Sequence, residues 1–366
     1  MSERKITSLY IHIPFCEHIC DYCDFTKVQY FSLFAKSYIE ELKKELNSYH
    51  IPHELETIYI GGGTPTALED DLFLELMEML KDYTKNVKEF TIEANPESLT
   101  INKLQMMKNG GVNRLSIGVE TTDDEILKNI NRHHTFIDVK KAVENAKKMG
   151  FYKINVDLIL GLPGSSLEQI KKDLDNLMTL DIQHISCYSL TVHPNTVFYL
   201  KGVQEPLDDQ ARIYYDYVHN YLAERGYRHY EVSNWAKPGF ESKHNAVYWK
   251  NEHYYGLGLG ASGYIKDIRY TNTKSINEYL KGKRVDYREI VTPEDDVEYQ
   301  IMLNLRTNVG IDLKQFEDKF GFDLNQKKKE DIDELIHRGY LIMTQGHLVP
   351  TYEGMMTLDQ IILKLI

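Results

Sequence analysis

A chain of 366 residues is long for one ordinary core, and its 42% hydrophobic and 27% charged residues are typical of a globular protein. Lys and Arg number 43 against 55 Asp and Glu, and the net charge of −12 disfavours a nucleic-acid or anionic-membrane partner that needs a broad basic face. The segment before Cys16 has charges but no apolar run, and no stretch approaches the roughly 20 apolar residues of a membrane span. We therefore expect a cytoplasmic protein whose thiols stay reduced.

Short β-rich runs alternate with amphipathic helical stretches through the first half of the chain. This alternation predicts a parallel sheet with right-handed crossovers, and six units instead of eight predict a partial (β/α)6 barrel that is open on one side for a large ligand. In such a barrel the functional side chains lie at the carboxyl ends of the strands. The expected strands are 8–13, 55–60, 89–93, 114–119, 153–160 and 184–190, and the expected helices are 34–49, 70–82, 100–109, 136–149 and 167–180.

The pattern changes after about residue 208. The order of three helices and a two-strand ribbon near the C-terminus resembles a winged helix, but the acidic surroundings disfavour DNA binding and favour a packing or lid domain. We divide the chain into a core barrel at 1–228, a connecting segment at 229–291 and a smaller, mostly helical C-terminal domain at 292–366. The expected elements are a helix at 209–225, a glycine-rich run at 256–263, helices at 293–305, 313–320 and 326–338, and strands at 340–343 and 347–350.

Three of the four cysteines form a CxxxCxxC directly after the first expected strand, at Cys16, Cys20 and Cys23. Three thiolates on a tight loop suit a cubane cluster, in which each sulfur holds one iron. Cubanes usually take four cysteines, so three leave one iron open to a small molecule with an amine and a carboxylate. The alternative is a zinc site, but zinc normally takes two pairs of ligands and His18 is awkwardly placed as a fourth. Cys187 lies in an apolar run and is expected to be a buried core thiol.

This cysteine spacing, with an aromatic residue before the last cysteine, resembles the fingerprint of the radical SAM superfamily. The resemblance implies a 4Fe-4S cluster that donates an electron to S-adenosylmethionine and releases a 5′-deoxyadenosyl radical, with the protein supplying orientation and exclusion of water. Both turnover of S-adenosylmethionine and a purely structural role for it are compatible with the sequence, so whether the protein is an enzyme is open.

Further segments extend the match, among them YIHIPFC at 10–16 and GGGTPT at 61–66. Glycines at the end of a strand let backbone amides approach a carboxylate or amino group closely, although alone they are also typical of a plain turn. The family commonly has Gln where this chain has Glu120, and a carboxylate there adds negative charge near the cofactor. The resemblance implies an S-adenosylmethionine pocket formed by Tyr10, Tyr22, Gly62, Gly63, Thr64, Glu93, Glu120, Arg132 and Asp157.

More narrowly, the whole chain resembles the coproporphyrinogen III dehydrogenase (HemN) family and, within it, the heme chaperone (HemW) branch. Three features favour the chaperone branch over the dehydrogenases. Phe25 occupies the position of the fourth cysteine of the dehydrogenases, the segment before Cys16 is shorter than their N-terminal extension, and HNAVYW at 244–249 matches the HNxxYW motif of the chaperones.

The resemblance implies a protein that binds heme as cargo and transfers it to apoproteins such as respiratory enzymes. His244 is then a candidate iron ligand, since imidazole is a common axial ligand of heme, and Tyr248 and Trp249 are candidates to line the macrocycle. Alternatively, His244 caps the following segment and the two aromatic residues belong to the core. The second axial ligand is left open.

Two other functions remain as alternatives. The first is an oxygen-independent coproporphyrinogen III dehydrogenase, which uses the same radical to oxidise two propionate side chains to vinyl groups with loss of carbon dioxide. The second is a winged-helix regulator that senses redox state through its cluster, and the acidic charge balance disfavours it.

Overall fold

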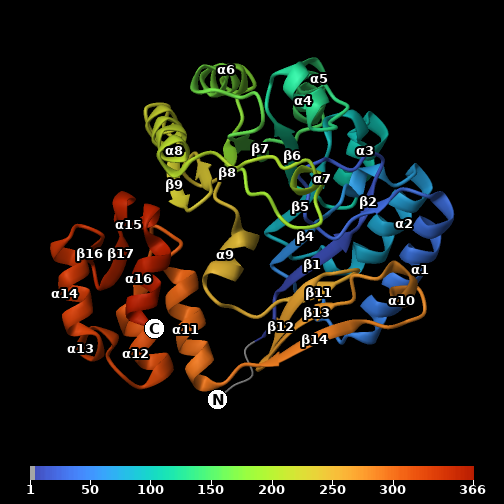
Figure 1. Ribbon diagram of the computed structural model, residues 1–366. Helices are drawn as coiled ribbons and strands as arrows, with labels where there is room; N and C mark the ends of the chain where they lie inside the picture. The colour runs from blue at the N-terminus through green and yellow to red at the C-terminus, as the bar shows by residue number, and fades with distance from the viewer. Residues whose placement is uncertain (1–4) are drawn as a thin grey trace.

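The computed structural model describes residues 5–366 and is organised around a curved nine-stranded mixed sheet (Figure 1). The predicted α/β class is confirmed, because the six predicted strands lie side by side in chain order and pair in parallel. These strands are β1 (Ser8–Ile13), β4 (Thr57–Gly62), β5 (Glu89–Ala94), β6 (Arg114–Glu120), β7 (Ile154–Leu160) and β8 (His184–Ser189).

Helices cover the outer face of this sheet and leave its inner face to a cavity (Figure 1). The strands alternate accordingly, because successive side chains point to opposite faces: in β7, Val156 and Leu158 are in the core, whereas Asn155 and Asp157 line the cavity. The covering helices are α1 (Ser32–Ser48), α2 (Asp70–Leu80), α3 (Ile101–Asn109), α4 (Asp124–Asn129), α5 (Phe136–Lys148), α6 (Leu167–Met178) and α8 (Asp208–Ala223).

The sheet extends beyond the six predicted strands at both edges. β11 (Tyr255–Leu257) pairs in parallel with β1, and β10 (Asn234–Ala236) pairs antiparallel with β8 and with β9 (Arg228–Glu231). The segment expected as a connection thus supplies edge strands, and between them α9 (Lys243–Trp249) carries the HNxxYW motif. These strands have only three or four residues each, too few for a clear alternation of apolar and polar positions.

The remaining elements form two smaller sheets and the C-terminal domain, which lies beside the open side of the barrel (Figure 1). The predicted C-terminal ribbon is confirmed, whereas the helix predicted over 326–338 is broken at Lys328. The domain has its own apolar core, which includes Ile301, Phe316 and Leu335. Its elements are α11 (Pro293–Asn304), β15 (Ile311–Asp312), α12 (Leu313–Phe320), α13 (Leu324–Lys327), α14 (Lys329–His337), β16 (Leu341–Thr344), β17 (His347–Pro350), α15 (Tyr352–Met356) and α16 (Leu358–Leu365).

A three-stranded antiparallel sheet within residues 262–290 adjoins β11 at the edge of the barrel, and short elements flank the cysteine loop. None of the helices formed by residues 5–366 combines the length and apolar content that a membrane crossing requires. The remaining elements are β2 (Phe15–Cys16), β3 (Val28–Gln29), α7 (Val197–Leu200), β12 (Ser262–Ile265), β13 (Ile268–Asn272), α10 (Ile276–Tyr279) and β14 (Val285–Ile290).

A buried carboxylate holds the glycine-rich run against α1. Glu45 is 1% exposed, and its oxygens accept hydrogen bonds from the Gly258 amide at 2.9 Å, Asn272 Nδ2 at 2.7 Å and Tyr279 Oη at 2.5 Å. Burial raises the pKa of Glu45, and the three donors oppose this shift. Gly258 has a φ of 97°, and a Cβ there would lie 2.5 Å from the His12 carbonyl oxygen, so glycine is required. These contacts place β11 beside β1 and complete one wall of the barrel.

Replacing Glu45 with Ala is expected to destabilise the protein by about 3 kcal/mol, because buried donors lose their acceptor. Urea unfolding measures this change, and Glu40→Ala on the exposed face of the same helix is the matched control. Equal stability of the two variants would contradict the role assigned to Glu45.

Candidate functional site

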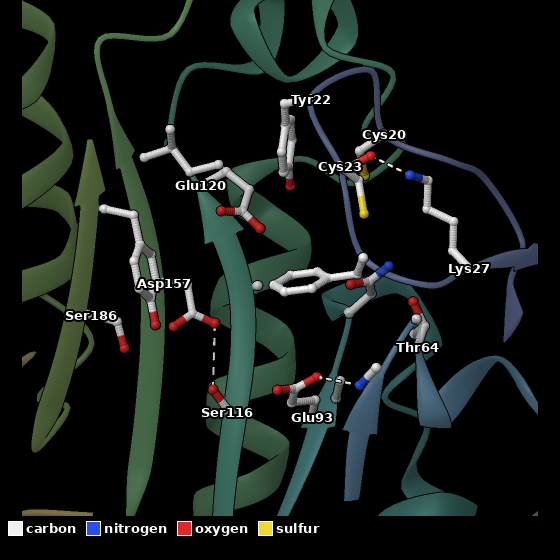
Figure 2. Close-up of a pocket in the computed structure, with 18 of the residues that line it drawn as sticks. Cys20, Tyr22, Cys23, Lys27, Thr64, Glu93, Ser116, Glu120, Asp157 and Ser186 are labelled. Atoms are coloured by element: carbon white, nitrogen blue, oxygen red, sulfur yellow. Dashed lines mark hydrogen bonds between the residues drawn. The ribbon is translucent and has the colours of Figure 1, made fainter. Parts of the chain in front are cut away.

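A cavity of about 420 Å³ lies inside the partial barrel and runs from the cysteine loop to Ser242 and Asn245 at the start of α9. Figure 2 shows side chains from several strand ends pointing into it. Tyr10, His244, Tyr248 and Trp249 are not part of the lining. The predicted site residues that do line it are Cys16, Cys20, Tyr22, Cys23, Gly62, Gly63, Thr64, Glu93, Glu120, Arg132 and Asp157.

The three loop cysteines are free thiols at one end of this cavity. Thr64 Oγ1 lies 3.7 Å from Cys16 Sγ, and Arg132 Nη1 lies 3.8 Å from Cys20 Sγ, so both donate toward sulfur. Burial raises the pKa of Cys16 to about 12 and that of Cys23 to about 11. These thiols are therefore neutral without a metal and need bound cations to become thiolate ligands.

The donor set fits a cubane cluster better than a single ion. Within residues 5–366, no three His, Cys, Asp or Glu side chains converge as ligands of one metal ion. A zinc site needs such convergence, whereas in a cubane each thiolate binds a different iron. Cys16, Cys20 and Cys23 would therefore hold three irons of a four-iron cluster, which supplies one-electron chemistry when bound.

Tyr10 supports the cysteine loop from outside the cavity. Its hydroxyl donates to His12 Nδ1 at 2.9 Å, and His12 Nε2 donates to the carbonyl oxygen of Thr26 at 2.7 Å. Thr26 lies just after the last loop cysteine. Burial lowers the pKa of His12 to about 4, which keeps the ring neutral and suits this donor–acceptor pair. His12 is a site residue that the sequence analysis missed, although it lies within the YIHIPFC segment.

Glu93 lies at the end of β5 against the glycine triplet (Figure 2). Its carboxylate accepts a hydrogen bond from the Gly62 amide at 2.9 Å and another from Tyr59 Oη at 2.7 Å. A Cβ on Gly61 would lie 2.7 Å from the Glu93 carboxylate, so the glycine makes room for it. Burial raises the pKa of Glu93 to about 7. Tyr59 was not singled out from the sequence, because an aromatic residue in a strand is typical of a core.

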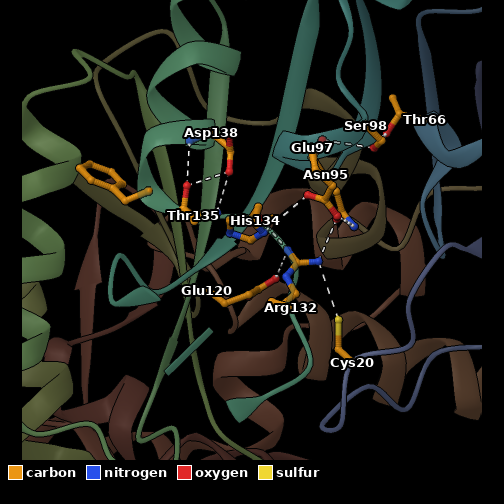
Figure 3. A network of polar contacts seen from close by, with 12 residues as sticks. Cys20, Thr66, Asn95, Glu97, Ser98, Glu120, Arg132, His134, Thr135 and Asp138 are labelled. Carbon is orange, nitrogen blue, oxygen red and sulfur yellow. Dashed lines mark hydrogen bonds and ion pairs between the residues drawn. The ribbon is translucent and has the colours of Figure 1, made fainter. Parts of the chain in front are cut away.

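Glu120 reaches the cavity through an irregular strand end. Its φ is 66°, and the pairing of β6 with β7 shifts register between Gly118 and Glu120. Arg132 Nη2 donates to Glu120 Oε1 at 3.1 Å and to the Gly118 carbonyl oxygen at 2.5 Å (Figure 3). Burial raises the pKa of Glu120 to about 7 against the opposing charge of Arg132. The extra negative charge expected at Glu120 is thus paired with a guanidinium.

Arg132 also joins the cavity wall to the cysteine loop. Its Nη1 donates to Asn95 Oδ1 at 2.9 Å and points toward Cys20 Sγ (Figure 3). One planar side chain therefore contacts residues after β5, at the end of β6 and in the loop. Arg132 was expected in the pocket from the family resemblance alone, and these contacts explain its position there.

Asp157 belongs to a polar network on the inner face of the sheet. Asn155 Nδ2 donates to Asp157 Oδ1 at 2.8 Å, and Ser116 Oγ donates to Asp157 Oδ2 at 3.4 Å (Figure 2). Burial raises the pKa of Asp157. The same Asn155 accepts from Ser186 Oγ, so side chains of three neighbouring strands are joined. Asn155 is a further lining residue that its sequence context did not indicate.

His244, expected as a candidate iron ligand, is fully buried and hydrogen-bonded at both ring nitrogens. His244 is 0% exposed, its Nδ1 lies 2.8 Å from Thr57 Oγ1 and its Nε2 lies 2.8 Å from Tyr248 Oη. Its backbone amide donates to Glu89 Oε1 at 2.9 Å, and burial lowers the pKa of the ring to about 3. With both nitrogens hydrogen-bonded, His244 anchors α9 to the base of the barrel.

Trp249, at the end of α9, faces the C-terminal domain. Its carbonyl oxygen accepts a hydrogen bond from Asn304 Nδ2 at 2.7 Å, and Gln300 Nε2 contacts the carbonyl oxygen of Lys250 at 3.4 Å. Figure 1 shows α9 between the sheet and α11. The HNxxYW segment therefore joins the two parts of the molecule.

Comparison with known proteins identifies two matching families. Residues 10–177 match the radical SAM superfamily, and residues 291–357 match the HemN C-terminal domain. The chain is 40% identical over 360 residues to heme chaperone HemW of Lactococcus lactis, covering 96% of this chain and 95% of that protein. It is 39% identical over 362 residues to heme chaperone HemW of Bacillus subtilis, covering 95% and 96%.

A solved structure shows the same fold over the whole chain. Coproporphyrinogen III oxidase (HemN) from Escherichia coli superposes with a TM-score of 0.85 at 22% identity, covering 100% of this chain and 91% of that one. Identity at this level supports the shared architecture of sheet and C-terminal domain, not a shared reaction.

Arg132→Ala is expected to destabilise the protein by about 3 kcal/mol, because it leaves the buried Glu120 carboxylate without its partner at pH 8. Adding Glu120→Gln to this variant removes the unpaired charge and should restore part of the lost stability. Urea unfolding of the wild type, the two single variants and the double variant gives the coupling energy. Strictly additive effects would contradict a direct Arg132–Glu120 interaction.

Proposed function

We propose that this chain, which belongs to the HemW family of the radical SAM superfamily, binds heme and delivers it to apoproteins such as respiratory enzymes. It does so as a protein that carries a 4Fe-4S cluster and S-adenosylmethionine. A cluster requires reduced thiols, and this requirement supports a location in the cytoplasm.

The observation that carries this proposal is the 40% identity over nearly the full length to a protein named heme chaperone HemW. Such identity spans the barrel, the HNxxYW segment and the C-terminal domain together, so it is not limited to the cofactor-binding part. Phe25 supports the same choice, because it stands where the dehydrogenases have a fourth cysteine.

The cavity residues divide between cluster and S-adenosylmethionine. The loop cysteines would hold the cluster, and its remaining iron would take the amino and carboxylate groups of the cofactor. Glu93, which accepts a hydrogen bond from the Gly62 amide, is suited to accept another from the iron-bound amino group, and Asp157 and Glu120 are suited to accept from ribose hydroxyls. Tyr22 and Thr64 lie beside the cluster end of the same cavity.

The alternative function is the oxidative decarboxylation of coproporphyrinogen III, since the chain shares its fold with the HemN enzyme. One experiment separates the two functions. The protein is reconstituted anaerobically with iron and sulfide and incubated with reductant, S-adenosylmethionine and coproporphyrinogen III, and the product mass is measured. A parallel sample is titrated with hemin and followed by absorbance.

We expect an unchanged porphyrinogen and stoichiometric heme binding. Loss of two carboxyl groups from the porphyrinogen would instead establish the dehydrogenase. Cys16→Ser should fail to assemble the full four-iron cluster, whereas Cys187→Ala, which alters a buried cysteine outside the loop, should assemble it. A full cluster in Cys16→Ser would overturn the cluster assignment.

Binding of S-adenosylmethionine should strengthen as the pH rises through about 7. Burial raises the pKa of Glu93 to about 7, so below that pH its carboxyl is protonated and must lose a proton to become a full acceptor for the N–H groups of the cofactor's amino group. Between pH 8 and pH 6 we expect the dissociation constant to rise about tenfold, measured by anaerobic calorimetry.

Glu93→Gln should bind more weakly and lose this pH dependence. Glu120, whose pKa is also raised to about 7, is the internal control. A pH dependence that persists in Glu93→Gln and disappears in Glu120→Gln would show that Glu120 titrates and would contradict the role given to Glu93.

A further inference from the structure

A protein that carries heme needs a ligand for its iron, and histidine is the side chain that most often serves. All 14 histidines lie within residues 5–366, and three of them line the cavity, namely His18, His184 and His193. His244 is outside the lining and fully buried. The three cavity histidines are therefore the candidates.

Two of these three are already engaged. His184 is buried, with Nδ1 2.6 Å from Asn155 Oδ1 and Nε2 2.7 Å from Tyr230 Oη. His18 lies inside the cysteine loop, and its ring stacks on His133 at a centroid distance of 3.6 Å. The His193 side chain is 46% exposed.

We propose that His193, on the loop between β8 and α7, is an axial ligand of heme iron at the mouth of the cavity. This inference rests on the proposed heme-binding function and adds which residue binds the iron and where the heme lies. The backbone around the ring is ordered, because the His193 carbonyl oxygen accepts hydrogen bonds from the Thr196 amide at 3.2 Å and from Thr196 Oγ1 at 2.7 Å.

The surroundings of His193 suit a porphyrin. Leu190 and Ile159 line the cavity, as do two large rings that are accessible to solvent, Phe25 at 66% and Tyr188 at 44% exposed. Exposed aromatic side chains at a pocket are typical of a ligand surface. A cavity of about 420 Å³ that also receives S-adenosylmethionine has too little room for a porphyrin as well. The macrocycle would therefore lie at the mouth of the cavity, where an acceptor protein can reach it.

The polar partner of His193 favours ligation. His193 Nε2 lies 3.5 Å from Asp24 Oδ2, directly after the last loop cysteine. A carboxylate beside one imidazole nitrogen helps to orient the ring, as it does for metal-bound histidines. Asp24 is thus a positioning residue for His193.

The loop that carries His193 is attached to the cysteine loop at further points. The Phe198 amide donates to the Asp21 carbonyl oxygen at 2.9 Å, and Lys201 Nζ donates to Asp21 Oδ2 at 2.6 Å. Asp21 and Asp24 directly follow Cys20 and Cys23. The proposed heme ligand is therefore joined through these contacts to the segment that would hold the cluster.

The test is a hemin titration of the full-length protein, with the dissociation constant and the Soret band as readouts. His193→Ala is expected to weaken binding about tenfold or more and to shift the Soret band. Added imidazole should restore the wild-type band, which a merely structural defect would not allow. The matched control is His337→Ala, which alters an exposed histidine on α14 that does not line the cavity, and it should behave as wild type.

Asp24→Asn keeps the ligand and should weaken binding less than His193→Ala, and it provides a second variant if the alanine variant folds poorly. Wild-type affinity and an unchanged Soret band in His193→Ala would overturn the inference and leave heme binding intact. A Soret shift in His244→Ala but not in His193→Ala would likewise overturn it and assign the iron to the HNxxYW segment. Absence of heme binding by the wild type would overturn the proposed function itself.

Discussion

The site depends on the hydrogen bonds and the ion pair that the guanidinium of Arg132 forms. The guanidinium lies among groups from separate segments, donating to Asn95, Gly118 and Glu120 and pointing toward the thiol of Cys20. A buried charge of this kind is tolerated only when it is paired and hydrogen-bonded, so the loop and the strand ends are held in one arrangement with it. Lys would not serve as well, because a single ammonium lacks the planar fork that reaches several acceptors at once.

The cavity around Arg132 contains more carboxylates than it can neutralise. Burial raises the pKa of Glu93 and Glu120 to about 7 and also raises that of Asp157. Such shifts mean that the ionised forms are destabilised without a partner. A ligand with its own positive charge relieves this cost, and S-adenosylmethionine has a sulfonium. The electrostatics of the barrel therefore agree with the cofactor that the cysteine spacing indicates.

The parts of the fold and site that were predicted correctly have a local origin. The six parallel strands follow from apolar runs separated by helices, and the cysteine loop is identified by spacing within a single segment. The edge strands β10 and β11 were missed because three residues carry too little pattern. His12, Tyr59 and Asn155 were missed because their roles depend on partners far along the chain.

The environment of His244 is the clearest example of a feature that its neighbours in the sequence do not reveal. Its hydrogen-bond partner Thr57 lies on β4 and its amide partner Glu89 on β5, both far away in sequence. A histidine next to aromatic residues in a motif suggests a ligand, and the same residue with both nitrogens engaged is a structural anchor. Ligation of iron by His244 would require breaking its bonds to Thr57 and Tyr248 and moving α9.

The proposed heme-binding function does not need such a rearrangement of α9. α9 connects the base of the barrel to the C-terminal domain through Glu89 on one side and Asn304 on the other, so moving it would disturb both. His193 lies instead on a surface loop at the opposite end of the cavity, next to the cysteines and accessible to solvent. A ligand that must be given up to another protein is better held at such a loop, because its exchange leaves the hydrogen bonds of the barrel intact.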